Sequence, residues 1–184
     1  MADERENTAN APEQDLNEMM RVRREKMDAF RAMGVAPFGH RFEVTDYAAD
    51  LKEKYDYLAE DEEGAEVRIA GRLMAIRGHG KASFSTLNDR TGNIQIYFKL
   101  DVLGEQKYKE EFKRLDLGDI IGIRGVVFKT RRGEITVRVE NFELLSKSLR
   151  PLPEKFHGLK DVDTRYRQRY LDLMVNLEVR ETFR

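Results

Sequence analysis

The segment 66–98, EVRIAGRLMAIRGHGKASFSTLNDRTGNIQIYF, constrains the fold of this chain more than any other. Apolar and polar residues alternate in its first and last parts, and a period of two is typical of β-strands that bury one face. Glycine, asparagine and aspartate, which favour turns, separate its parts. We therefore predict a meander of three strands. The strands are expected at 67–74, 81–87 and 94–98, and the turns between them at 78–80 and 88–92.

One helix and two more strands are predicted to follow the meander, at 101–116, 120–129 and 134–144. Two glycines inside the fourth strand indicate a bulge or a tight bend. The resulting order, β-β-β-α-β-β over residues 65–146, is that of the OB-fold, a small Greek-key barrel whose strand face binds oligonucleotides or oligosaccharides. A different five-stranded barrel or an open sheet is the alternative. The fold class is therefore mainly β, with flanking helices.

Two helices are predicted before the barrel. Residues 1–14 are polar and acidic, and we expect a disordered tail. Within an N-terminal helical extension, 15–64, apolar residues recur at helical spacing along 15–33, and Gly34 is well placed to end this helix. A second helix is expected at 45–58, with its first residue, a threonine, as the N-cap.

The first of these helices carries a basic face. Arg21, Arg24 and Arg31 fall on one polar side of it. Such a helix can face a phosphate backbone. It can equally be a solvated amphipathic helix that packs on its own domain, and the two interpretations are compatible because the apolar and basic stripes lie on different faces.

Composition excludes several classes of protein. Hydrophobic residues make up 40% and charged residues 36%, and no run of about 18 apolar residues is present, so we expect no membrane span. Without cysteine there is no disulfide framework and no thiolate site, which fits a cytoplasmic protein. The three histidines fit no metal-ligand spacing. Since the formal net charge is -1, binding to nucleic acid would need a local basic patch.

The character of the sequence changes in 147–184. Two prolines lie close together and are followed by a dense run of arginine and tyrosine. This composition indicates a linker that leads into a new helical element. A further helix is expected at 177–184, where no C-terminal stop signal occurs before the last residue. We therefore expect the sequence to be a fragment that lacks its next domain.

Alternation places Tyr97, Thr136 and Arg138 on the outer face of the barrel, and four further side chains are candidates for a binding site on that face. Phe84 lies between two serines, and if its ring faces outward, a stacked base contributes about 1–3 kcal/mol. The amide of Gln95 offers donors and an acceptor to a Watson–Crick edge. Glu134 can accept from a base N–H, and Arg77 can contact a phosphate or stack on a second base. Taken singly, Phe84 would be assigned to the core and the others to ordinary surface; only their convergence on one face indicates a site.

Seven stretches closely resemble the bacterial class II lysyl-tRNA synthetases. Related aspartyl- and asparaginyl-tRNA synthetases share the barrel, but the long last stretch points to the lysine enzymes. The resemblance runs from residue 15 nearly to the end. The stretches are MRVRREK (20–26), VRIAGRLM (67–74), GKASF (80–84), NIQIY (93–97), LDLGDIIG (115–122), KTRRGEITV (129–137) and LRPLPEKFHGLKDVDTRYRQRYLDL (149–173).

The resemblance implies a lysine–tRNA ligase whose barrel binds the uridine-rich anticodon of lysine tRNA. It implies that Phe84 stacks on the central uridine, that Gln95 hydrogen-bonds an anticodon base, and that Arg77 and Glu134 share this site. The N-terminal basic helix would lie near the anticodon stem. Residues 177–184 would begin the motif 1 helix of a homodimer interface.

The resemblance also implies ATP and Mg²⁺ as cofactors of the whole enzyme, and none for these residues. The catalytic sheet that binds ATP is absent from the sequence, so no catalytic residue is assigned. We expect these residues to bind tRNA weakly without attaching lysine to it.

Two other functions fit the residues. One is a free-standing OB-fold module that binds single-stranded nucleic acid without sequence preference. In that case Gln95 and Glu134 would contribute to binding but not to discrimination. The other is an oligosaccharide-binding barrel or a protein-interaction scaffold, which would show no salt-dependent binding to an anticodon stem-loop.

Overall fold

The computed structural model describes residues 11–78, 80–152 and 162–183. The chain divides into two compact units, 1–149 and 150–184, and each is described by itself. Within the described residues, no helix combines the length and apolar character needed to cross a membrane.

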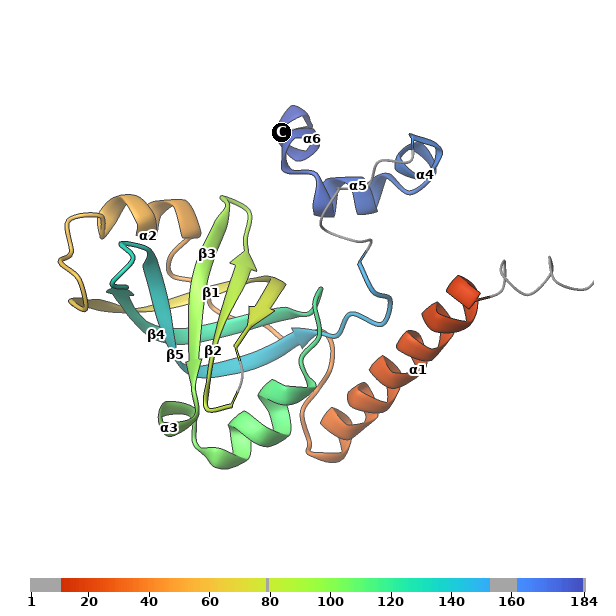
Figure 1. Cartoon of the computed structure of the whole chain (residues 1–184), viewed down its shortest axis with the longest axis horizontal. Coiled ribbons are helices and arrows are strands. Elements are labelled where there is room, and N and C mark those ends of the chain that lie inside the picture. The colour runs from red at the N-terminus through yellow and green to blue at the C-terminus, as the bar shows by residue number, and fades with distance from the viewer. Residues whose placement is uncertain (1–10, 79, 153–161, 184) are drawn as a thin grey trace, which may run out of the picture. The chain divides into compact units, whose positions relative to one another are not determined.

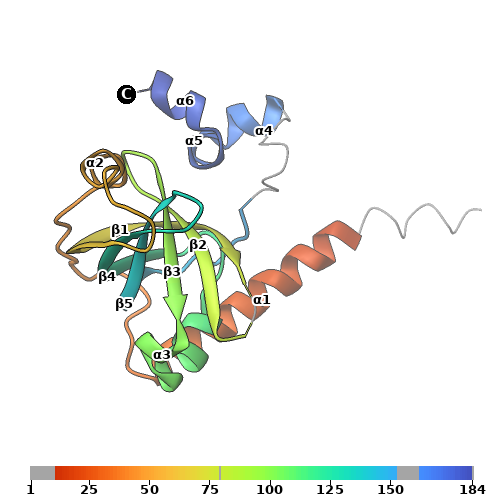
Figure 2. The same cartoon turned by 60° about the vertical axis from the view of Figure 1, so that its left-hand side comes forward.

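Five strands form a closed barrel in the first unit, in the order β1-β2-β3-β5-β4 (Figures 1 and 2). Every neighbouring pair is antiparallel except β3 and β5, which run parallel. The predicted five-stranded barrel is therefore confirmed, and the open sheet is excluded. The strands are β1 (Glu63–Arg77), β2 (Ala82–Asn88), β3 (Asn93–Lys99), β4 (Ile120–Lys129) and β5 (Ile135–Ser146).

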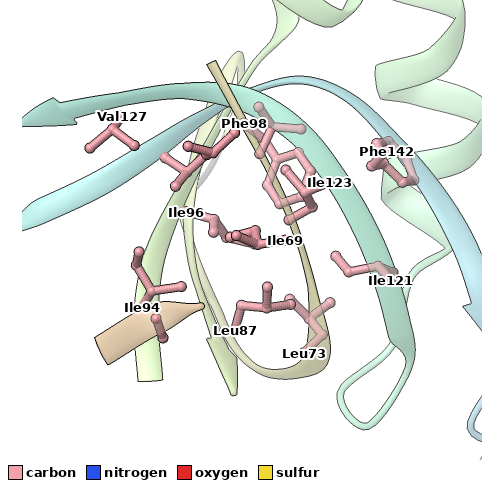
Figure 3. Packing of buried hydrophobic residues seen from close by; sticks show 14 of the residues in the cluster. Ile69, Leu73, Leu87, Ile94, Ile96, Phe98, Ile121, Ile123, Val127 and Phe142 are labelled. Atoms are coloured by element: carbon pink, nitrogen blue, oxygen red, sulfur yellow. The ribbon is translucent and has the colours of Figure 1, made fainter. Parts of the chain in front are cut away.

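The alternating apolar residues fill the interior of the barrel, as Figure 3 shows. On β3, for example, Ile94, Ile96 and Phe98 are buried while the residues between them are partly exposed. Burial of each such side chain contributes about 1.5–3 kcal/mol, so the strand register is strongly specified. The labelled core residues are Ile69, Leu73, Leu87, Ile94, Ile96, Phe98, Ile121, Ile123, Val127 and Phe142.

Gly125 marks the bulge predicted in the fourth strand. The β4–β5 register shifts between Arg124 and Gly125. A Cβ atom at Gly125 would lie 2.1 Å from the carbonyl oxygen of Arg138. Only glycine permits this close approach of two strands, so the bulge and the glycine are linked.

The first helix, α1 (Ala11–Ala32), begins earlier than predicted. The predicted tail boundary at residue 14 is wrong, because Pro12 is tolerated in the first helical turn, where its missing N–H costs no hydrogen bond. Residues 1–10 lie outside the described residues. The helix ends as predicted: Gly34 has φ 77, and the N–H of Val35 donates to Phe30 O at 2.9 Å.

The second helix, α2 (Ala48–Lys54), is shorter than the predicted 45–58, and its predicted cap is wrong. Thr45 makes no cap, and its hydroxyl oxygen instead accepts from the N–H of Arg68 at 3.0 Å. The N–H of Ala48 donates to Asp89 Oδ2 at 2.7 Å, and the N–H of Ala49 to Thr91 Oγ1 at 3.0 Å. The turn between β2 and β3 therefore caps α2 from a distance in sequence.

The single helix predicted at 101–116 is also wrong. Gly104, with φ 84, separates α3 (Leu100–Leu103) from a π-helical turn η1 (Lys107–Glu111) and a 3₁₀ turn η2 (Phe112–Arg114). Phe112 packs on the core residue Phe98, with ring centroids 4.3 Å apart. The connection between β3 and β4 thus closes one end of the barrel, although it is irregular.

The second unit contains the predicted helical element, and residues 153–161 of the predicted linker lie outside the described residues. Its helices are α4 (Val162–Arg167), α5 (Arg169–Val175) and α6 (Leu177–Thr182). Asp172 organises it: its carboxylate is buried and accepts hydrogen bonds from Arg165, Arg169 and Asn176.

A charge cluster joins α1 to the barrel. The ammonium of Lys147, after β5, donates to Asp116 Oδ2 at 2.6 Å and to Asp119 Oδ2 at 2.7 Å. The side chains of Lys147 and Asp119 have no exposed surface. On α1, Lys26 donates to the other oxygen of Asp116 at 2.6 Å, and Arg23 donates to Ser148 O at 3.0 Å.

Replacing the buried cation should destabilise the fold. Lys147→Met keeps the length of the side chain but leaves two carboxylates together in the interior, and we expect the free energy of unfolding in urea to fall by about 3–5 kcal/mol. Lys52→Met, on the exposed side of α2, is the control and should change it little. Equal losses in the two variants would contradict the role given to Lys147.

The same cluster makes stability depend on pH. Burial acts to raise the pKa of Asp116, but hydrogen bonds from Lys147 and Lys26 outweigh it and hold the pKa below its usual value. The ionised form therefore stabilises the fold above the unfolded pKa of about 3.9, and this stability is lost as pH falls through the folded pKa. The unfolding free energies of wild type and Asp116→Asn should differ most above about pH 5 and converge below about pH 4. A difference that does not change with pH would contradict this assignment.

Candidate nucleic-acid interface

Four side chains form a row across the outer face of the barrel. Cross-strand pairing places Arg77 of β1 opposite Phe84 of β2, Phe84 opposite Tyr97 of β3, and Tyr97 opposite Arg138 of β5. We call this set the outer row. Because directly opposite residues lie about 5 Å apart, the row is a continuous surface.

Phe84 faces outward, an orientation that the sequence pattern alone left open. Its side chain is 38% exposed, whereas Ser83 and Ser85 on either side of it are buried. Its ring packs on Tyr97 with centroids 4.6 Å apart, and Tyr97 meets the edge of Phe128 at 6.2 Å. The aromatic surface therefore extends from Phe84 across Tyr97 to Phe128, and it is held by strands rather than by a loop.

Gln95 lies on the same face, one step along β3 from the outer row. It is opposite Thr136 of β5, and its Nε2 donates to Thr136 Oγ1 at 2.9 Å. Gln95 and Phe84 are diagonal neighbours on adjacent strands, so a base stacked on Phe84 is within reach of the Gln95 amide.

Glu134 lies one residue before β5, so its predicted place in the fifth strand is wrong. It belongs to the hairpin turn, where its backbone pairs with Thr130: the Glu134 N–H donates to Thr130 Oγ1 at 3.1 Å, and the Thr130 N–H donates to Glu134 O at 3.0 Å. The turn orders the backbone and leaves the side chain exposed. Glu134 is therefore at the edge of the face, beyond Gln95.

The charges around the face are mixed. Arg138 of the outer row pairs with Glu63 of β1, and the hydrogen bond between them raises the pKa of Arg138. Arg77, Lys81 and Arg132 are exposed, and none of them forms an ion pair with the described residues. These three cations supply the local positive charge that a chain of net charge -1 needs for a phosphate backbone.

The structure does not bring the three arginines of α1 into one free basic patch. Arg21 pairs with Glu18 and Glu25, and Arg31 pairs with Asp28 at 3.0 Å. Arg24 is exposed and has no ion pair within the described residues. These pairs are exposed to solvent, so they contribute little to stability and compete weakly with a phosphate. Contact of α1 with a nucleic-acid backbone stays a prediction.

Three side chains were expected to face outward but were given no role from the sequence: Tyr97, Thr136 and Arg138. Strand alternation puts all of them outward, but only the parallel β3–β5 register shows that Thr136 lies beside Gln95 and Arg138 beside Tyr97. As for metals, no group of three or more His, Cys, Asp or Glu side chains in the described ranges is arranged to hold an ion.

Residues 67–145 match the family model tRNA_anti-codon, described as an OB-fold nucleic acid binding domain. The barrel is an OB-fold. The match begins within β1 and ends one residue before the end of β5, and it includes every residue of the outer row.

Proteins named lysine–tRNA ligase are similar to almost the whole chain. The protein from Thermoanaerobacter sp. (strain X514) is 56% identical over 171 residues, which cover 92% of this chain and 33% of the relative. The one from Halalkalibacterium halodurans is 55% identical over 171 residues, which cover 91% of this chain and 34% of the relative. The one from Pelotomaculum thermopropionicum is 56% identical over 175 residues, which cover 95% of this chain and 34% of the relative. The chain thus spans about a third of the length of the curated relatives it matches.

Removing the exposed ring should weaken binding of single-stranded RNA. Phe84→Ala loses a stacking partner, and we expect a loss of about 1–3 kcal/mol in a titration of a labelled oligoribonucleotide. Phe38→Ala is a matched control, because Phe38 is 43% exposed and bridges to Ser146 at the far end of β5. Unchanged affinity of Phe84→Ala, with the fold intact by circular dichroism, would contradict the stacking role.

Proposed function

We propose that the outer face of the OB-fold recognises the anticodon of lysine tRNA, as part of a lysine–tRNA ligase. The observation that carries this proposal is an exposed aromatic ring, Phe84, stacked on Tyr97 and placed beside the Gln95 amide on a neighbouring strand. A ring alone binds any base, whereas a ring beside a fixed amide can select one.

Each side chain has a separate task in this proposal. One anticodon base stacks on Phe84, and Gln95 hydrogen-bonds its Watson–Crick edge. Glu134, at the edge of the face, accepts from the N–H of another base. Arg77, next to Phe84 in the outer row, neutralises a phosphate and contributes affinity without sequence preference. On α1, the three arginines Arg21, Arg24 and Arg31 face the backbone of the anticodon stem.

The similar proteins support the rest of the proposal. Their shared name, lysine–tRNA ligase, indicates attachment of lysine to tRNA, and they are about 55% identical to this chain. The proposal adds ATP and Mg²⁺ as cofactors of the whole protein. The protein as a whole would be a cytoplasmic homodimer, with motif 1 at 177–184 contributing to the interface. The proposal assigns none of the described residues to lysine activation; they bind tRNA only.

Titration with anticodon stem-loops that differ only at the three anticodon bases tests this function. The lysine anticodon should bind most tightly. Gln95→Ala should lower its preference over other anticodons by about tenfold, because a base edge is then left without its partner. Gln106→Ala, an exposed amide outside this face, is the matched control and should leave the preference unchanged.

A protein that bound every stem-loop equally would instead be a module without sequence preference, and the proposal would be wrong. Absence of salt-dependent binding to any stem-loop would point to the oligosaccharide or protein-scaffold alternative.

A further inference from the structure

Thr136 occupies an unusual position on the outer face. Alternation along β5 directs its side chain outward, yet it has no exposed surface. It faces Gln95 across the parallel β3–β5 pair, and Gln95 itself is partly exposed. Thr136 is thus buried beside Gln95, a candidate for reading a base. The only polar group of the Thr136 side chain is its hydroxyl, so any effect on the Gln95 amide must come through this group.

The hydrogen bonds of Thr136 have a defined direction. A hydroxyl carries one hydrogen, and that of Thr136 donates to Glu134 O at 3.1 Å. Its oxygen is therefore left to accept, and it accepts from Gln95 Nε2 at 2.9 Å. If the Gln95 amide were turned over, its oxygen would compete with Glu134 O for the one hydrogen of the Thr136 hydroxyl. The carbonyl of Glu134 thus sets the orientation of the Gln95 amide through Thr136.

This orientation decides what Gln95 offers to a ligand. The amide nitrogen is turned toward Thr136, so the carbonyl oxygen Oε1 is turned away from it. Oε1 has no hydrogen-bond partner among the described residues. A base approaching Gln95 therefore meets an acceptor that is already oriented, together with the remaining amide hydrogen.

We propose that Thr136 is a positioning residue that fixes the Gln95 amide so that it selects bases with an imino N–H beside a keto oxygen. Uracil and guanine have this edge. Cytosine and adenine place a ring-nitrogen acceptor there, which would face Oε1 without a hydrogen. This inference rests on the proposed function of the face, and it adds a residue that does not itself touch the base.

One substitution can remove the Thr136 hydroxyl with little other change to the strand. Thr136→Val removes the hydroxyl but keeps a β-branched side chain that suits a strand. The carbonyl of Glu134 stays paired, because the Thr130 N–H also donates to it at 3.0 Å. Thr86→Val is the matched control: Thr86 is opposite Gln95 on the other side, on β2, and makes no side-chain hydrogen bond with the described residues.

The test compares stem-loops with uridine or cytidine at each anticodon position. Wild type should prefer uridine at the position that Gln95 reads. Thr136→Val should lower this uridine-to-cytidine ratio by about tenfold, because the freed amide can turn over and accept cytidine. Thr136→Ser should restore the ratio, and Thr86→Val should keep it. A Thr136→Val protein that kept the ratio, or weakened binding to every loop alike, would overturn the inference.

A second measurement needs no RNA and separates this inference from the proposed function. The Gln95 side-chain amide signals in a nitrogen–proton NMR spectrum report the hydrogen bond to Thr136 directly. They should shift in Thr136→Val and not in Thr86→Val. Unchanged signals would overturn the positioning role, even in a protein that selects the lysine anticodon. If the signals shift in Thr136→Val but the wild-type protein does not discriminate between anticodons, the positioning role stands and the proposed function is wrong.

Discussion

The parallel pairing of β3 with β5 is the constraint on which the site depends. β1 pairs with both β2 and β4, so the sheet becomes a barrel only where β3 meets β5. That seam consists of three residue pairs, and two of them, Gln95 with Thr136 and Tyr97 with Arg138, have their side chains on the outer face. The contact that closes the core therefore also assembles the polar part of the interface. If β5 slipped by one residue at this seam, Thr136 and Arg138 would turn inward and the buried Val137 outward.

Other parts of the first unit hold this seam in register. Gly125 lets β4 approach the backbone of β5 at Arg138, the residue that ends the outer row. Phe112 packs on Phe98 and closes one end of the barrel. After β5, Lys147 is clamped by two aspartates from the β3–β4 connection. The side chains of the face are thus positioned by the core behind them, which is what a preorganised binding site requires.

Local patterns in the sequence were enough to locate all five strands of the barrel. They left open whether the ring of Phe84 faces outward, which the structure shows. The errors arose where residues distant in sequence, or one unusual backbone angle, decide the outcome. Asp89 and Thr91 cap α2 in place of Thr45, and the positive φ of Gly104 interrupts the helix predicted at 101–116. The pairing of Gln95 with Thr136 was out of reach for the same reason, since no local pattern reveals a parallel register.

Affinity and selectivity have different physical origins on this face. The rings of Phe84 and Tyr97 and the charge of Arg77 attract any unpaired base and its phosphate, so by themselves they would make a general binder. Selection requires a polar group whose orientation is fixed before the base arrives, because an amide free to turn over matches two opposite edges equally well. The hydrogen bonds from Gln95 to Thr136 and from Thr136 to Glu134 O remove that freedom. The rings can therefore be exchanged for other rings with a change mainly in affinity, whereas selectivity depends on a hydroxyl that lies beneath the surface.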